Sequence, residues 1–179
     1  MNGLRDKFFF SLMALFLSQG AMALSTDRDQ PINIEADRAE ADHGKRVTTY
    51  YGDVIITQGT LKISGDTVTI EYDDQDRLTK LVSEGSPAKF RQLPDGKSDV
   101  PTNYQVAQAS RMEYYAGEDL IVLLGEAVYG QGGDQVAADR IVYDSIRSRL
   151  KAESSAAAGS DGEQPSSRVR IKIEPKKSP

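Results

Sequence analysis

The strongest constraint on the fold is an alternation of apolar and polar residues that recurs along the chain. Clear runs of this alternation are residues 32–34, 61–63, 68–72 and 169–173. Turn-forming residues separate the runs, at 42–44, 58–59, 73–76, 94–96 and 131–133. Because a period of two places successive side chains on opposite faces of a strand, the pattern predicts an all-β protein. The length and spacing of the alternating runs predict about fifteen short antiparallel strands.

The alternating segments also repeat along the chain. Segments related by 73 residues are 52–59 with 125–132 and 63–71 with 136–144; segments related by 29 residues are 34–38 with 63–67 and 107–111 with 136–140. Each unit places Asp or Ser after a small residue, where the side chain can bond nearby backbone and turn the chain between strands. Because one unit cannot bury its apolar face alone, the repeat predicts a duplicated β unit whose copies stack.

Residues 1–23 have the features of a secretory signal peptide. Two basic residues precede an apolar run at 8–17, and Ala21 and Ala23 form an A-x-A cleavage site ahead of Leu24. The apolar run is about half of the roughly 20 residues that span a bilayer, which argues against a membrane anchor. We therefore expect an exported, soluble mature chain.

The mature chain is expected to form one domain with a separate last strand. Residues 24–153 have the length of a single domain that buries a moderate core. Residues 154–167 are rich in Ser, Ala and Gly, which predicts a flexible loop. Alternation returns at residues 168–174, which predicts a C-terminal edge strand, and residues 175–179 predict a solvated tail.

Composition argues against several classes of function. The net charge of −5 disfavours nucleic-acid binding, which needs a basic surface. With no cysteine and a single histidine, His43, the chain lacks the ligands of a usual transition-metal site. The acidic run at 73–76 fits a hairpin turn better than a calcium loop. Asp66 and Asp139 occupy the same position in the two repeats, as structural residues would, so we expect no enzyme and no cofactor.

The apolar faces of the strands remain as the candidate functional feature. In a compact sandwich these faces fill each other, and this filled core is the usual arrangement. If the sheets splay apart, the same faces line a groove for hydrocarbon, at roughly 0.8 kcal/mol per buried CH₂. The residues alone leave both arrangements open.

Four segments of the chain resemble one known family. They are DQPINIEAD at 29–37, GDVIITQG at 52–59, GSPAKF at 85–90 and ASRMEY at 109–114. In this order after a signal peptide, they resemble the LptA/OstA-like family of periplasmic lipopolysaccharide-bridge proteins, over about residues 27–152 and 168–175. The resemblance implies a semi-open, twisted β-jellyroll in the periplasm, with the acyl chains of lipid A in a groove between its sheets.

The resemblance places four residues in this lipid-binding groove: Ile32, Ile34, Phe90 and Tyr114. The alternation adds ten candidates, for which the alternative is plain core packing: Tyr50, Val54, Ile56, Leu61, Ile63, Val68, Ile70, Met112, Val136 and Ile141. The rival hypotheses for function are a closed β-sandwich that serves as a structural or adaptor module of the envelope without lipid cargo, and then a β-sheet hydrolase.

The expected partners follow from the resemblance and from the strand edges. The resemblance implies lipopolysaccharide, the single-span periplasmic component of an inner-membrane exporter, and the periplasmic domain of an outer-membrane translocon. Exposed edges at 31–37 and 168–174 predict head-to-tail strand pairing between copies of the chain. Alternatively, the last strand folds back onto its own sheet and its charges cap a monomer.

Overall fold

The structure is a computed structural model that describes residues 26–94, 96–97, 99–100, 103–154 and 168–175. The elements in chain order are the 3-10 helix η1 (Thr26–Asp29) and the strands β1 (Ile32–Glu35), β2 (Arg38–Asp42), β3 (Val47–Gln58), β4 (Leu61–Tyr72), β5 (Leu78–Gln92), β6 (Gln105–Tyr115), β7 (Leu120–Gln131), β8 (Asp134–Asp144), β9 (Arg149–Glu153) and β10 (Arg170–Lys172). The predicted all-β class is confirmed. The prediction of about fifteen short strands is wrong, because the described residues form ten, of which six are 11 residues or longer.

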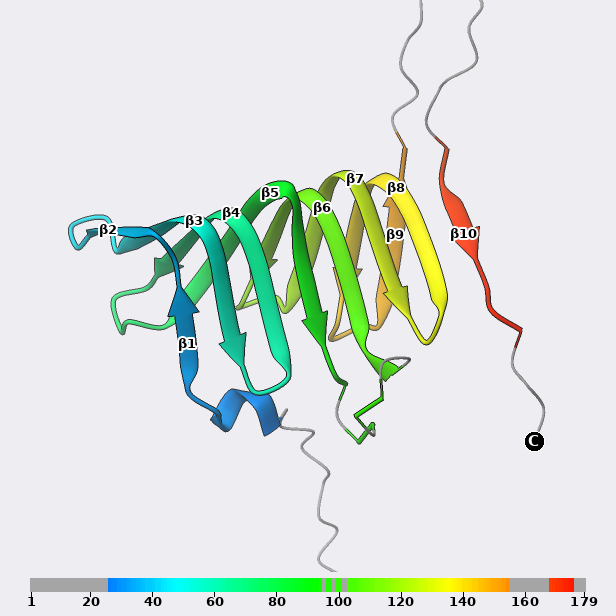
Figure 1. Cartoon of the computed structure of the whole chain (residues 1–179), viewed down its shortest axis with the longest axis horizontal. Helices are drawn as coiled ribbons and strands as arrows, with labels where there is room; N and C mark the ends of the chain where they lie inside the picture. The colour runs from blue at the N-terminus through cyan, green and yellow to red at the C-terminus, as the bar shows by residue number, and fades with distance from the viewer. Residues whose placement is uncertain (1–25, 95, 98, 101–102, 155–167, 176–179) are drawn as a thin grey trace, which may run out of the picture.

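All strands belong to one antiparallel sheet that folds over on itself (Figure 1). One half of β3 pairs with β1 and the other half pairs with β2. In the same way, β8 pairs with β10 through one half and with β9 through the other. The long strands thus pass through two layers: the first layer runs from β1 to β10, and the second layer runs from β2 to β9.

Each long strand bends where its pairing register shifts. In β3 the shift lies between Tyr51 and Val54, and equivalent shifts occur in β4 through β8. Gly52 has a φ of 80°, and a Cβ there would lie 2.2 Å from Oδ2 of Asp37, so the bend requires glycine at this position. We call the row of these bends the bend line. The strands are fewer than predicted because each run continues across the bend line as one strand.

The predicted duplication is visible in the strand boundaries. β3 and β7 start and end 73 residues apart, and β6 covers the equivalents of β1 and β2 together. Positive φ angles recur at the same offset, for example 80° at Gly52 and 75° at Gly125. One detail differs from the prediction, because Asp66 and Asp139 lie at bends inside β4 and β8 and not in turns between strands.

The two layers enclose an apolar interior that is most tightly packed beside the bend line. Val54 and Ala109 of the first layer and Val68 and Ile141 of the second have no exposed surface. Apolar side chains closer to the strand ends are partly exposed, and they include Ile34, Leu61, Phe90, Tyr114 and Tyr143. The interior is therefore packed at the bend line and less covered toward the strand ends, which we call the rims.

The sheet is open at its two lateral edges. Among the described residues, β1 and β2 at one edge pair only with β3, and β9 and β10 at the other pair only with β8. This confirms the semi-open fold and excludes a closed barrel for this part of the chain. β10 covers the centre of the predicted edge strand at 168–174 and pairs with β8 of its own chain, as the folded-back alternative expected.

The predicted signal peptide, most of the predicted 154–167 loop and most of the tail lie outside the described residues. No helix in the described ranges is long and apolar enough to cross a membrane.

Candidate functional site

Thirteen of the fourteen predicted groove residues lie in one apolar cluster between the layers. Seven of them are buried: Val54, Ile56, Ile63, Val68, Ile70, Met112 and Ile141. Six are partly buried and pack against the first group: Ile34, Tyr50, Leu61, Phe90, Tyr114 and Val136. Ile32 is the exception, because it lies near the rim opposite Gln58 and is 61% exposed.

The first layer contributes a nearly unbroken apolar row. Strand register aligns Ile34, Ile56, Ile63, Phe90, Ala107, Tyr129, Val136 and Ile171, one residue from each strand segment. Because neighbouring strands lie about 4.8 Å apart, the row is about 33 Å long. The row thus gives the first layer an apolar strip from one edge of the sheet to the other.

The second layer faces this strip with a row of its own. Register aligns Tyr50, Val68, Ser83, Met112, Leu123, Ile141 and Ala152. The only polar member, Ser83, is fully buried, and its hydroxyl donates a hydrogen bond to the carbonyl oxygen of Ser64 at 3.4 Å. The polar atom is therefore satisfied and the interior remains apolar in character.

A stacked tyrosine pair joins the layers near β8. The ring centroids of Tyr129 and Tyr143 lie 5.2 Å apart with 28° between the ring planes. Burial raises the pKa of Tyr129 strongly, and the neighbouring Tyr143 adds to the effect, so its hydroxyl stays neutral. The pair therefore adds a direct aromatic contact between the two layers.

Sequence reasoning missed several residues of this interior. Leu123, Tyr129 and Tyr143 belong to the cluster, yet they were not among the candidates. A signal was present, because they stand 73 residues after Tyr50, Ile56 and Ile70, which were candidates. Alanines at 88, 109 and 127 were also missed, and they form the closely packed floor beside the bend line.

The rim of the first layer is polar on its inward side. Gln92, Gln105 and Gln131 are aligned across β5, β6 and β7, and each lies two residues beyond the apolar strip along its strand. The interior therefore changes from hydrocarbon to amide chemistry at this rim.

The 3-10 helix η1 covers the part of this rim that lies near the N-terminal strands of the sheet. Asp27 is 6% exposed and accepts hydrogen bonds from the backbone N–H and the hydroxyl of Thr60, both at 2.7 Å, and from Nε2 of Gln92 at 3.3 Å. Burial opposes ionisation of Asp27, but these hydrogen bonds outweigh it and lower the pKa of its carboxyl group. η1 is thereby fixed to the β3–β4 turn and to the end of β5.

Groups suited to acid–base or metal chemistry are not gathered in the described part of the chain. Asp66 in β4 and Asp139 in β8 are separated in the sheet by β5, β6 and β7, so they form no catalytic pair. No cluster of His, Asp and Glu in the described ranges could hold a metal ion. His43 lies in an exposed turn beside a surface cavity of about 410 Å³.

Fold and interior together define an open, folded β-sheet protein with an apolar interior between two layers. The family model described as "LptA/(LptD N-terminal domain) LPS transport protein" matches residues 33–149. The chain belongs to this family, as the sequence motifs indicated.

Individual relatives agree with this assignment. The chain is 36% identical to the lipopolysaccharide export system protein LptH of Pseudomonas aeruginosa, over 94% of this chain and 93% of the relative. It is 36% identical to LptA of Escherichia coli K12, over 69% of this chain and 64% of the relative. The crystal structure of LptH, described as the LptA homologous periplasmic component of the lipopolysaccharide transport device of P. aeruginosa, matches with a TM-score of 0.68 and 32% identity, covering 83% of this chain and 99% of that one. The family comprises transport proteins, which agrees with the expectation of no enzymatic activity.

Proposed function

We propose that this chain is a periplasmic lipopolysaccharide transport component that holds the acyl chains of lipid A between its two layers. The observation that carries the proposal is the apolar strip of the first layer, which crosses the whole sheet and faces a second apolar row. Family membership supports lipopolysaccharide as the cargo and the periplasm as the compartment.

The gradient of burial supports different roles for the predicted groove residues. Val54, Val68 and Ile141 beside the bend line are fully buried, so they hold the layers together. Ile34 and Phe90 are only partly buried, which supports a role for them in contacting an acyl chain between the layers. Because each buried CH₂ contributes roughly 0.8 kcal/mol, a few methylene groups suffice for useful affinity.

Similar apolar lining along the strip would let the lipid slide without meeting water. Very tight binding at one point would stop this movement. The chain is expected to need no energy source of its own, since the inner-membrane exporter supplies the driving force.

Open sheet edges support a bridge built from several copies or several proteins of the same fold. β1 and β2 form one edge and β9 and β10 the other, and a free strand edge pairs with another strand by β-augmentation. The expected neighbours are a second copy of the chain, the single-span component of the exporter, and the periplasmic domain of the translocon. The family model, which also describes the N-terminal domain of LptD, supports partners of this kind.

The test is lipid binding by the purified mature protein. Mass spectrometry should detect co-purifying lipopolysaccharide, and added lipopolysaccharide should bind equally well with and without a metal chelator. Absence of lipid, or binding that chelator abolishes and calcium restores, would contradict the proposal. A protein without lipid that still bound its envelope partners would instead be an adaptor module.

A further inference from the structure

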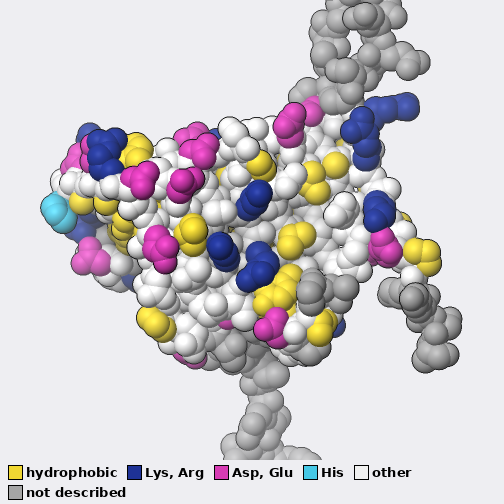
Figure 2. Space-filling model, viewed as in Figure 1, with side chains coloured by type: hydrophobic (Ala, Val, Ile, Leu, Met, Phe, Trp, Pro, Cys, Tyr) yellow, Lys and Arg dark blue, Asp and Glu magenta, His cyan; other side chains and the backbone are white. Residues whose placement is uncertain are grey.

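An unbalanced basic patch lies on the outer face of the first layer. Lys62 stands directly opposite Arg91 on the neighbouring strand, and Lys89 lies two residues before Arg91 on the same face. All three side chains point outward, because their neighbours Ile63 and Phe90 belong to the interior cluster. Figure 2 shows basic side chains gathered on this face, over the first-layer halves of β4 and β5.

The patch destabilises the fold, because like charges directly opposite each other in a sheet repel. Within the described residues, Lys62, Lys89 and Arg91 form no ion pair with a carboxylate, although the chain carries a net charge of −5. By contrast, Arg111 and Lys80 on the outer face of the second layer both pair with Glu113. Arg111 and Lys80 are thus neutralised within the fold, whereas the three cations of the patch remain available to an external anion.

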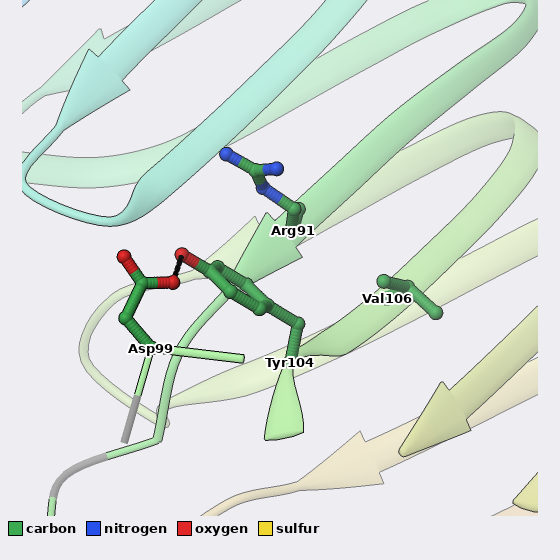
Figure 3. Close-up of a pocket in the computed structure, with 4 residues that line it drawn as sticks. All are labelled: Arg91, Asp99, Tyr104 and Val106. Atoms are coloured by element: carbon green, nitrogen blue, oxygen red, sulfur yellow. Dashed lines mark hydrogen bonds between the residues drawn. The ribbon is translucent and has the colours of Figure 1, made fainter. Parts of the chain in front are cut away.

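Arg91 is held ready for such an anion by the adjacent tyrosine. Its Cζ lies 4.6 Å from the ring centroid of Tyr104, and the hydroxyl of Tyr104 donates a 2.8 Å hydrogen bond to Oδ1 of Asp99 (Figure 3). That hydrogen bond raises the pKa of Tyr104 and keeps its ring neutral. Stacking occupies one face of the guanidinium and leaves its N–H edges for two parallel hydrogen bonds to an oxyanion.

A cavity beside Arg91 offers room for more than an ion. Its volume is about 350 Å³, and it is lined by Arg91, Asp99, Tyr104 and Val106. Tyr104 and Val106 supply an apolar wall of the kind that packs against a sugar ring. A phosphorylated sugar therefore fits this surface better than an inorganic ion alone.

The patch is also placed correctly for a molecule with apolar tails and a charged head. On β5, Phe90 faces the interior, Arg91 faces the outer surface, and Gln92 is the last residue of the strand at the rim. The apolar side chain of Phe90 and the cationic side chain of Arg91 thus come from successive residues near the rim of the sheet. η1 covers the rim near Thr60 and Gln92, so the head group would approach from the side of β6.

We propose that Arg91, flanked by Lys62 and Lys89, binds a phosphate group on the sugar head of the transported lipid. The inference rests on the proposed function for the identity of the cargo. The anion site itself depends only on the patch and can be tested without lipid.

Titration of the isotope-labelled mature protein with glucosamine phosphate, followed by NMR, tests the anion site. We expect amide shifts at Lys62, Arg91 and Tyr104 that glucosamine without phosphate does not produce. Arg91→Gln should weaken binding about 10-fold, because it removes the bidentate donor. Asp99→Asn should strengthen binding about two-fold, because it removes a negative charge from the cavity while keeping an acceptor for Tyr104. Arg140→Gln is the matched control, since Arg140 pairs with Glu153 on the other layer, and it should change nothing.

The outcomes separate this inference from the proposed function. Equal shifts with glucosamine and its phosphate, or unchanged affinity in Arg91→Gln, would overturn the phosphate site even if lipopolysaccharide binds. A polyglutamate peptide that bound as tightly as the phosphorylated sugar would also overturn it and would make the face a docking surface for an acidic protein. Phosphate binding in a protein that does not take up lipopolysaccharide would instead contradict the proposed function.

Discussion

Removal of the Asp27 carboxylate should detach η1 from the rim and destabilise the domain. Asp27→Ala leaves the N–H and the hydroxyl of Thr60 without their acceptor, in a place that is 6% exposed. Hydrogen bonds to a charged group contribute about 1.5–3 kcal/mol each and are not additive, so we expect a loss of about 3 kcal/mol. For a domain of this size, that loss lowers Tm by roughly 10 °C.

Thermal and urea unfolding, followed by circular dichroism, measure this loss. Asp29→Ala is the matched control, because Asp29 lies in the same helix and is exposed, and it should change stability by less than about 0.5 kcal/mol. Equal melting of Asp27→Ala and the wild-type protein would show that the Asp27 hydrogen bonds do not hold the rim.

The same carboxylate predicts a pH dependence with a definite sign. The folded-state pKa of Asp27 lies below its ordinary value of 3.8, so the stabilisation is fully present above that value and is lost as the pH falls through the folded pKa. The difference in Tm between wild type and Asp27→Asn should therefore stay constant from about pH 7 to pH 5 and shrink below about pH 4. A difference that shrinks between pH 7 and pH 5 would contradict the assignment.

Two further perturbations test the interior and the edge. Ile34→Asp, Phe90→Asp and Tyr114→Asp should each weaken lipopolysaccharide binding at least about 10-fold while the protein still unfolds cooperatively. Val54→Asp should instead unfold the domain, because an unpaired charge at a fully buried site costs several kcal/mol. Loss of the cooperative melting transition in all four variants would favour plain core packing. Truncation before Arg168 removes β10 and should abolish any growth of mass with concentration in light scattering, while a strict monomer at every concentration, with partner binding unchanged by truncation, would contradict the bridge.

Local periodicity was enough to predict the strand class, the duplication and the inward faces. Alternation fixes which face a side chain takes, and thirteen candidates accordingly share one cluster. Alternation does not determine how deeply a side chain is buried, and Ile32 shows this. Ile32 lies on the same face of β1 as Ile34, but it pairs with Gln58 near the rim and remains exposed. The depth of burial depends on the opposite layer, and the sequence of a single strand does not show which residues of that layer will cover it.

Long-range features could not be read from local pattern. The bends that turn fifteen expected strands into ten described ones are register shifts, which depend on how two strands pair. Asp27 gained its role from Thr60 and Gln92, which lie 33 and 65 residues away. The basic patch likewise arises only because the register places Lys62 opposite Arg91.

Photo-cross-linking at two adjacent tyrosines tests most directly whether the lipid lies between the layers. Tyr114 belongs to the interior cluster, while Tyr115 follows it on the opposite face of β6, and both side chains are partly buried. A benzophenone amino acid placed at each position in turn would be irradiated in the presence of lipopolysaccharide, and the adducts would be detected with an antibody against the polysaccharide. We predict strong adducts at position 114 and none above background at position 115. Equal adducts at both positions, or adducts only at 115, would contradict an interior lipid site.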